Sequence, residues 1–591
     1  MAHKIWRSPY SHFGGLISVR PNDQTDETLT AVGVYTDGEL ARIAAEGFNA
    51  IWLHGVIANL VRVEPFTELG ANRGAHLAAV NTLIERAARH NLKVFLYTQP
   101  LRAVAVDNQE FWERHAALGG QEEFATEQVV PATLNQRILF RCLCTSTEPV
   151  KRWHRMAMAQ LAGALPGLGG VILITASEYP AHCYSHRHKV NPAPWAPLIE
   201  CPRCKEREPW EVAAELVRLM RDGVRDVSQS IDVIAWNWGW GSYLPPPCRE
   251  LVEALPQDVI LMADFERGGH MDLPARPHFP INEYSLLYGG PSELCRGSHD
   301  VARARGMRVM SKLQLGTTHE LATVVSLPLL GSVYDKALYH RRHPGCGYMG
   351  CWNFGNMTSA NTTGFNYFLD AECPADKQAA LERFAARYFE GCSARLVAEA
   401  WELFDAAMQY FPFTIPFLYN GVHSHALAYG EIYRPGPLRG EPAGCSYLNL
   451  GGRRGDDLSA SVEADGGEFS LDETIERLGK LAVLWEVGVG RLKEGLKGCD
   501  ERHELGNAII VGALWRSAEN AYKTYRLRKN WSDAKRAELS HVIKDELAAV
   551  GTAMPWVEKD PRQGHHGEAQ QRFFSPGSMA EKMATLEKRL E

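Results

Sequence analysis

Acidic side chains follow several apolar, strand-like runs of this chain, and others lie in polar segments nearby. Cleavage of a glycosidic bond needs two carboxyl groups, one that donates a proton and one that is ionised. The candidate acids are Glu178, Asp264, Glu266, Glu283 and Glu320. Glu178 directly follows an apolar run, so burial is expected to raise the pKa of its carboxyl. We predict Glu178 as the proton donor, with Glu320, the Asp264/Glu266 pair or Glu283 as base or nucleophile.

Aromatic, amide and cationic side chains stand at the ends of the same apolar runs. They are Arg20, His54, Arg102, Trp236, Asn237, Trp238, Lys312, Gln314 and Trp352. Indole faces stack on the apolar faces of pyranose rings, so the tryptophans are candidate sugar platforms, with packing in the core as the alternative. The cations either neutralise the acids or bind a substrate carboxylate, such as that of a uronate or a sialate. This set of residues predicts a carbohydrate substrate.

A second chemical signal lies in the Cys/His-rich segment 179–208. Two cysteines occur on one tight turn, Cys-Pro-Arg-Cys at 201–204, and a third cysteine lies 18 residues upstream among histidines. Three thiolates and an imidazole suit a closed, structural zinc site, whereas free thiols or a redox pair are the plainer alternatives. The predicted zinc ligands are Cys183, His186, Cys201 and Cys204. The other candidates for the fourth position are His182, His188 and Cys144.

Eight strand-like runs must position these side chains. They cover residues 16–20, 50–54, 94–99, 171–178, 233–240, 259–266, 309–314 and 348–354. Helical patterns at 37–47, 75–90, 148–165, 209–227 and 292–306 lie between them. Strands that alternate with helices form parallel sheets, and eight such units predict a closed (β/α)8 barrel over residues 1–360. An open doubly wound sheet is the alternative, but Gly-x-Gly-x-x-Gly after the first strand and Walker A sequences are both missing.

The rest of the chain, residues 361–591, is predicted to be a mainly helical C-terminal domain. Helical patterns cover 376–389, 393–410, 473–496, 501–528, 533–550 and 578–591. Between them, residues 411–472 are rich in Gly, Pro and aromatic residues. The C-terminal helices offer a surface on which a homodimer could form.

The composition is that of a globular protein. Of the 591 residues, 45% are hydrophobic and 23% are charged, which excludes intrinsic disorder and collagen-like structure. The 63 Lys and Arg against 70 Asp and Glu give a net charge of -7, and basic residues form no stripe with aromatics, so nucleic acid is not expected as a partner. No apolar run approaches a membrane span, and the first residues lack the apolar core of a secretory signal. With 13 scattered cysteines, these features predict a cytoplasmic protein.

Several motifs resemble bacterial barrel-type glycoside hydrolases, in the style of families 20 and 67. The motifs are GFNAIWLH at 47–54, ITASE at 174–178, CPRC at 201–204, EYS at 283–285 and KLQ at 312–314. The resemblance spans about residues 8–360, and DPRQGH at 560–565 is similar to the C-terminal segments of such enzymes. It implies an exo-acting enzyme whose acid, at the end of the fourth strand, is Glu178. Family 20 has an Asp before this Glu, whereas this chain has Ser177, which speaks against substrate-assisted cleavage of N-acetylhexosaminides.

The sequence as a whole predicts an exo-acting glycoside hydrolase that removes a terminal sugar, such as an acidic or amino sugar. One alternative is a metal-dependent barrel hydrolase or lyase that uses the Cys/His site as a Lewis acid. The other is a carbohydrate-binding barrel without catalytic activity.

Overall fold

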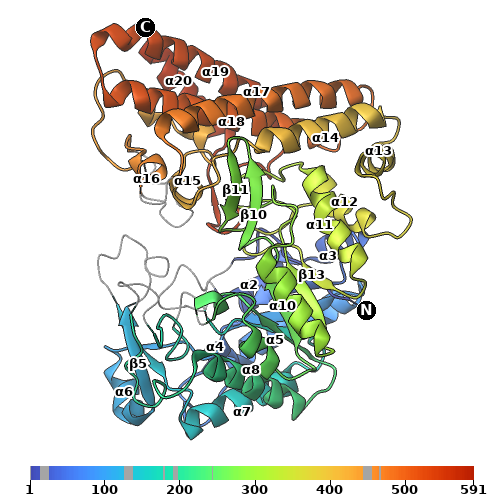
Figure 1. Ribbon diagram of the computed structural model, residues 1–591, viewed down its shortest axis with the longest axis vertical. Helices are drawn as coiled ribbons and strands as arrows, with labels where there is room; N and C mark the ends of the chain where they lie inside the picture. Colours follow the sequence, from blue (N-terminus) through green and yellow to red (C-terminus); the bar gives the residue numbers. More distant parts are fainter. Residues whose placement is uncertain are drawn as a thin grey trace. The chain divides into compact units, whose positions relative to one another are not determined.

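The structure is a computed structural model of the 591-residue chain (Figure 1). It describes residues 2–12, 26–124, 138–176, 180–190, 197–242, 244–443, 455–464 and 468–591. The chain forms two compact units. The first unit comprises Met1–Phe265, Ser292–Leu313 and Gly345–Gly350, and the second comprises Glu266–Pro291, Gln314–Pro344 and Cys351–Glu591. These units interleave along the chain, so the domain boundary between residues 360 and 361 stays a prediction.

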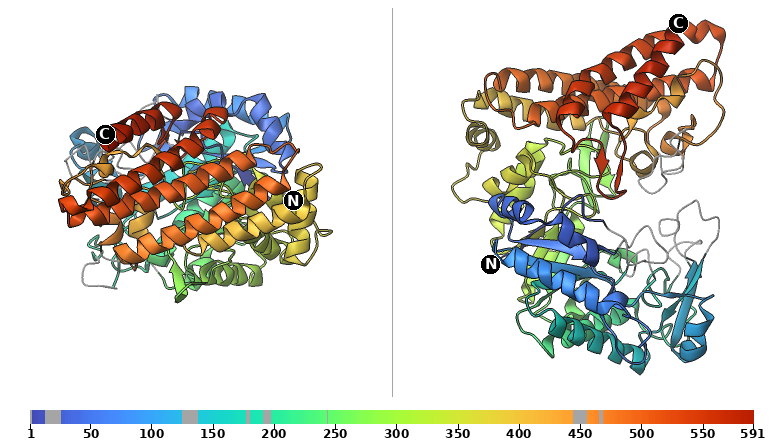
Figure 2. Two further views of the ribbon diagram at one scale, coloured as in Figure 1. Left: turned by 90° about the horizontal axis from the view of Figure 1, so that it is seen from above. Right: turned by 180° about the vertical axis from the view of Figure 1, so that it is seen from behind.

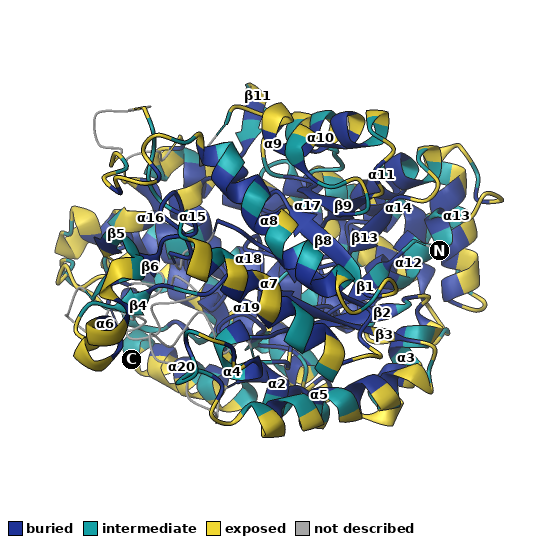
Figure 3. Ribbon diagram, turned by 90° about the horizontal axis from the view of Figure 1, so that it is seen from below, coloured by how far each residue is buried: buried dark blue, intermediate teal, exposed yellow. Residues whose placement is uncertain are grey.

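The first unit contains a closed barrel of eight parallel strands. They are β1 (Lys4–Trp6), β2 (Ala50–His54), β3 (Lys93–Thr98), β7 (Gly170–Leu173), β8 (Asp232–Trp236), β9 (Ile260–Asp264), β12 (Val309–Lys312) and β13 (Gly347–Met349). They follow one another around the ring in chain order, and β1 pairs with both β2 and β13 to close it. The strands are buried, as their dark blue ribbons show in Figure 3. The predicted (β/α)8 barrel is confirmed.

The first strand differs from the prediction. Lys4–Trp6 takes the first place in the ring, with Ile5 and Trp6 both fully buried. Residues 16–20, predicted as this strand, lie outside the described residues, and so does Arg20. A strand of three residues shows too little alternation to be recognised in the sequence.

Helices connect the barrel strands; those near residues 37–47, 75–90, 148–165, 209–227 and 292–306 were predicted, whereas those at 27–34 and 249–254 were not. In the first unit these are α2 (Glu27–Val34), α3 (Asp37–Ala45), α5 (Arg73–Ala88), α7 (Glu148–Ala164), α8 (Pro209–Arg225), α9 (Arg249–Ala254) and α10 (Glu293–Ala304). Local signals set their ends: α8 starts with a capping box between Glu208 and Glu211, and the Ser292 side chain caps α10. Gly47, just after α3, has φ +87°, a conformation that glycine adopts without strain.

An insertion between β3 and β7 was not predicted. It contains α6 (Gln109–His115) and a three-stranded antiparallel sheet in the order β4 (Val104–Ala105), β6 (Leu139–Leu143), β5 (Gly119–Phe124). The insertion lies at the carboxyl end of β3, where the functional residues of such barrels gather.

The second unit is mainly helical, as predicted for the C-terminal region (Figure 2). Its longer helices are α11 (Leu330–Arg342), α12 (Ala360–Phe368), α13 (Lys377–Tyr388), α14 (Ala394–Met408), α17 (Leu471–Gly495), α18 (Glu504–Lys529), α19 (Arg536–Lys559) and α20 (Pro576–Leu590). Buried aromatic rings hold α14, α17 and α18 together: Phe404 stacks on Trp485 at 4.3 Å, and Trp515 meets Trp485 edge-on. Two hairpins accompany the helices, β10 (Gly269–Leu273) with β11 (Arg276–Ile281), and β14 (His565–His566) with β15 (Gln571–Arg572).

Among the described residues, no helix combines the length and the apolar character that crossing a bilayer requires.

Candidate active site and metal centre

In the first unit, the carboxyl ends of β8, β9 and β12 bring together Trp236, Asn237, Asp264 and Lys312. Trp236 Nε1 donates a hydrogen bond of 2.9 Å to Asp264 Oδ1, and the Asp264 amide donates one of 3.0 Å to Asn237 Oδ1. Lys312 lies opposite Asp264 in the register of the neighbouring parallel strands, so both side chains project from the same face of the sheet. All four residues are at most 3% exposed.

These contacts change the interpretation of the tryptophans. Trp236 is fully buried and serves as a hydrogen-bond donor to Asp264, so it does not offer an open ring face. Trp240 is also fully buried and donates to Thr175 Oγ1 at 3.0 Å. Trp238 and Trp352 are partly exposed and keep the role of candidate sugar platforms.

A cavity of about 570 Å³ opens at the carboxyl ends of β2 and β3. Its polar lining includes His54, Gln99 and Arg102, and its apolar lining includes Ile57 and Phe140. Arg102 Nε donates to Gln99 Oε1 at 2.5 Å, and an Arg102 terminal nitrogen lies 3.1 Å from His54 Nε2. A guanidinium has no acceptor, so His54 must accept this hydrogen bond in its neutral form. Burial, with the charge of Arg102, lowers the pKa of His54 well below its ordinary value and favours this form.

Glu266, in the second unit, belongs to a buried ion pair. Lys336 Nζ lies 2.5 Å from Glu266 Oε1, and both side chains are completely buried. The same ammonium donates to the carbonyl oxygens of Ser285 and Gln314, and the Gln314 amide donates to Glu266 Oε1 at 3.0 Å. Glu266 therefore fixes the segments that follow β9 and β12.

Glu320 is a buried carboxylate that holds a loop. It accepts hydrogen bonds from Ser285 Oγ at 2.6 Å, from the Leu286 amide at 2.7 Å and from Thr318 Oγ1 at 3.0 Å. Burial raises the pKa of Glu320. The Leu287 amide is a fourth donor to Glu320, at 3.3 Å, so the acceptor sites of this carboxylate are filled by the protein and it is better suited to shape the loop than to reach a substrate.

Glu283 has a different environment within the second unit. Tyr419 donates its hydroxyl proton to Glu283 Oε2 at 2.5 Å, the Tyr284 amide donates to Oε1 at 2.9 Å, and Arg267 Nε lies 4.0 Å from Oε1. Burial acts against ionisation, but the charges of Arg267 and His319 and these hydrogen bonds hold the pKa of Glu283 below its ordinary value. Glu283 is thus a buried carboxylate that stays ionised.

Glu178, the predicted proton donor, lies outside the described residues. The described chain resumes at residue 180, and the Ala103 amide donates to the Pro180 carbonyl at 2.7 Å. This bond joins the segment after Glu178 to the wall of the cavity that contains Arg102.

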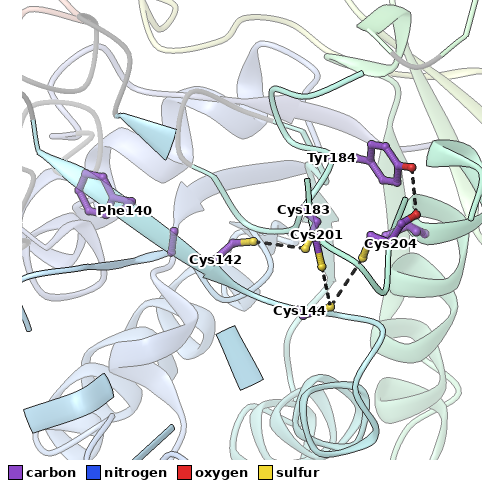
Figure 4. Close-up of a cluster of buried hydrophobic side chains, with 9 residues drawn as sticks. Phe140, Cys142, Cys144, Cys183, Tyr184, Cys201 and Cys204 are labelled. Atoms are coloured by element: carbon purple, nitrogen blue, oxygen red, sulfur yellow. Dashed lines mark hydrogen bonds between the residues drawn. The ribbon is translucent and has the colours of Figure 1, made fainter. Parts of the chain in front are cut away.

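Four buried cysteines of the first unit form a cluster that could hold a metal ion (Figure 4). The Sγ atoms of Cys144, Cys183, Cys201 and Cys204 all lie within 4.8 Å of one another. Cys144 Sγ is 3.8 Å from Cys201 Sγ and 3.6 Å from Cys204 Sγ, close to the spacing of about 3.8 Å that tetrahedral Zn–S bonds of about 2.3 Å require. Hydrogen bonds from Cys183 and Cys204, and from Arg203, lower the pKa of Cys144 to about 6, which favours the thiolate that binds metal.

The fourth member of this cluster corrects the predicted ligand set. His186 is not among the four: its Nδ1 lies 3.1 Å from a carboxylate oxygen of Glu123. Cys144, which follows β6, stands in its place and was only one of the alternatives in the sequence. A set of four thiolates leaves no open coordination position, which fits a structural metal better than a Lewis acid.

Arg7, which directly follows β1, was not among the predicted site residues. Its guanidinium is fully buried, pairs with Glu27 at 2.8 Å and lies 4.0 Å above the Trp52 ring. Glu27 also accepts a hydrogen bond of 2.9 Å from the His54 amide. The position of Arg7 at the end of a barrel strand was the available signal, but the strand itself was not recognised.

Comparison with known proteins gives structural similarity only. No protein-family model matches the chain, and no curated protein sequence matches it. Similar solved structures include a GH138 enzyme targeting pectin rhamnogalacturonan II, with 9% identity and a TM-score of 0.47 over 93% of this chain and 62% of that one. They also include the Thermobaculum terrenum O-GlcNAc hydrolase (9% identity, TM-score 0.34, 98% and 96% of the two chains). The α-amylase of Geobacillus thermoleovorans is similar as well, with 15% identity and a TM-score of 0.32 over 66% of this chain and 80% of that one.

This chain therefore spans about three fifths of the length of the rhamnogalacturonan II enzyme. These three structures are of glycoside hydrolases, and at these identities they assign no activity to this chain.

Proposed function

We propose that this protein is a glycoside hydrolase that removes a terminal sugar by carboxylate catalysis. The observation that supports it most strongly is the environment of Glu283. A carboxylate that is buried yet held ionised by Arg267, His319 and Tyr419 is suited to stabilise or attack an oxocarbenium-like centre.

In this proposal, Glu178 keeps the role of proton donor predicted from the sequence, and Glu283 is assigned as the second carboxylate, base or nucleophile. Asp264, fixed by Trp236 and facing the same side as Lys312, is assigned to substrate positioning. Glu266 and Glu320 are assigned to the scaffold, because Glu266 Oε1 pairs with Lys336 and both oxygens of Glu320 accept hydrogen bonds from the loop at 285–287. The test is hydrolysis of a panel of nitrophenyl glycosides that includes uronides, sialosides and N-acetylhexosaminides.

For the substrate class we propose an acidic sugar bound by Arg102. The cavity of about 570 Å³ is of a size that suits one or two sugar residues. His54 and Gln99 orient the guanidinium, whose planar fork matches a carboxylate. A cavity that recognises one charged ring favours cleavage at a chain end.

Replacing Arg102 with Met should lower kcat/KM for uronide or sialoside substrates by about 10- to 100-fold, because one charge-assisted hydrogen-bonded contact is lost. The kcat/KM for the matching neutral glycoside should change by less than about threefold. The measurement is kcat/KM for the charged and for the neutral substrate in each variant. Arg114→Met, on the exposed face of α6, is the control. An equal loss on charged and neutral substrates would remove Arg102 from the recognition of the carboxylate.

We propose further that the four-cysteine cluster holds a structural zinc ion. Cys144 follows the inserted sheet, whereas Cys183, Cys201 and Cys204 follow β7. Zinc at this point would join the insertion to the segment that follows Glu178. It would cross-link these two segments and take no part in the reaction.

Cys144→Ser should remove the zinc and lower the melting temperature by about 5 °C or more, because the three remaining thiolates do not complete the tetrahedral site that links the insertion to the segment after β7. Activity should fall in step with the folded fraction when the wild-type protein is chelated. Metal analysis and thermal unfolding check both effects. Cys142→Ser is the matched control, since the Cys142 thiol lies 3.6 Å from Cys183 Sγ but outside the cluster. Zinc retained in Cys144→Ser, or lost in Cys142→Ser, would contradict the assignment.

A further inference from the structure

The hairpin β14–β15 near the end of the chain carries an acid that the catalytic proposal does not use. Glu568 lies in the turn between His566 and Gln571 and is 7% exposed. Its Oε1 accepts a hydrogen bond of 3.2 Å from Asn353 Nδ2. Asn353 comes four residues after the last residue of β13 in the chain.

Close backbone packing holds this turn in place. A Cβ atom at Gly567 would lie 2.0 Å from the Phe354 carbonyl oxygen, so only glycine fits there. The Gly564 amide donates to the Thr323 carbonyl at 2.7 Å, and the His566 ring lies 5.5 Å from the Phe354 ring. The turn therefore presents Glu568 at a fixed position beside Trp352 and Asn353.

Two buried side-chain amide groups, that of Asn353 beside Glu568 and that of Gln314 beside the Trp352 backbone, have one hydrogen-bonding atom each without a partner among the described residues. Asn353 is 1% exposed, and its Nδ2 faces the Glu568 carboxylate, which leaves Oδ1 as the orphaned acceptor. Gln314 is fully buried, and its Oε1 accepts from the Trp352 amide at 3.3 Å, which leaves Nε2 as the orphaned donor. Buried polar atoms nearly always have a partner, so these two point to a bound polar ligand.

We propose that Glu568, Asn353 and Gln314 form a subsite that binds the hydroxyl groups of a saccharide. The inference deepens the proposed glycoside hydrolase function and rests on it for the choice of a sugar. A hydroxyl group donates one hydrogen bond and accepts others, and this set offers a carboxylate, an amide oxygen and an amide N–H. Trp352, partly exposed and adjacent in the chain, adds the aromatic face on which a pyranose ring stacks.

The direction of the Asn353–Glu568 bond gives the design of the test. Glu568→Gln replaces a charge-assisted hydrogen bond with a weaker neutral one, whereas Asn353→Asp combined with Glu568→Gln rebuilds a charge-assisted bond with donor and acceptor exchanged. A purely structural pair is restored by this exchange. A sugar site is not restored, because the charge and the orphaned acceptor are both altered. Glu581→Gln, on the exposed face of α20, is the control for the same chemical change.

The experiment measures binding of four monosaccharides, glucuronate, galacturonate, N-acetylneuraminate and N-acetylglucosamine, to the full chain by ligand-observed NMR, with the melting temperature of each variant. We expect at least one sugar to bind the wild type and Glu581→Gln equally, and to bind Glu568→Gln about 10- to 100-fold more weakly. The exchanged double variant should recover the melting temperature but not the affinity.

Equal affinity in Glu568→Gln and the wild type, recovery of affinity in the double variant, or no binding of any of the four sugars to the wild type would overturn the proposal. Binding that depends on Glu568 in a protein that hydrolyses none of the nitrophenyl glycosides would keep the subsite and refute the hydrolase. Hydrolysis that is lost in Glu283→Gln but unaffected in rate and KM by Glu568→Gln would keep the hydrolase and refute the subsite.

Discussion

Glu283→Gln should leave the protein folded and lower kcat by about 10³-fold or more. The amide has nearly the shape of the carboxylate and still accepts the Tyr419 hydrogen bond of 2.5 Å, but it carries no charge for the developing cation at the anomeric carbon. The measurement is kcat at saturating substrate, with the melting temperature as the check on folding. Glu320→Gln is the comparison, because its loss of loop hydrogen bonds should lower the melting temperature while activity per folded molecule is retained.

Glu178→Gln should also lower kcat, by about 10²- to 10⁴-fold, but with a dependence on the leaving group. A dinitrophenolate leaves without a proton, so the loss should be much smaller for dinitrophenyl glycosides than for alkyl glycosides. Glu283→Gln should slow both substrate types. Wild-type turnover in either variant, or the same leaving-group dependence in both, would contradict the assigned roles.

Lys336→Met should destabilise the second unit by about 3–5 kcal/mol, the cost of leaving a buried charge without its partner. Glu266 and Lys336 are completely buried, and the ammonium also bonds the carbonyls of Ser285 and Gln314, so its removal affects three segments at once. Thermal or urea unfolding, followed by tryptophan fluorescence, measures the loss.

Two comparisons identify the cause of that loss. Lys377→Met removes the exposed pair with Asp335, where both side chains are at least 40% exposed, and should cost less than about 1 kcal/mol. Adding Glu266→Gln to Lys336→Met should recover part of the stability, since no charge is then left buried. A double variant less stable than Lys336→Met alone would show that packing, not charge, explains the effect.

The architecture of the barrel could be predicted because its strands and helices repeat with strong periodicity. β2 was predicted at its observed bounds, and α7 and α10 within one or two residues, since apolar spacing and caps define them. β1 was missed because a strand of three residues carries almost no pattern. The inserted sheet was missed although β5 and β6 have six and five residues, because β5 (GGQEEF) is polar and rich in glycine and does not alternate like a strand. Cys144 is 57 residues away from Cys201 in sequence, and only the folded insertion brings the two thiols together.

The types of the site residues were predictable from the sequence, but the role of each residue depends on the atoms that its side chain contacts in the fold. Trp236 fits a sugar platform by sequence, yet its indole N–H is bound to Asp264 inside the barrel. Glu320 and Glu283 are both buried acids after barrel strands, and opposite surroundings move their pKa values in opposite directions. Glu568 lies 215 residues after Asn353, so no spacing in the sequence could connect them.

The two units interleave along the chain, which limits where the protein can be divided. The chain crosses between the units at residues 265/266, 291/292, 313/314, 344/345 and 350/351. A clone that stops after residue 360 would keep Glu283 and Asn353 but discard Tyr419 and Glu568, their partners. The first unit is complete at residue 350, whereas the second unit needs residues 266–291 and 314–344 together with 351–591. A fragment that contains the whole barrel therefore also carries two pieces of the second unit without the rest of it, and during synthesis these pieces wait for residues 351–591 before their unit can close.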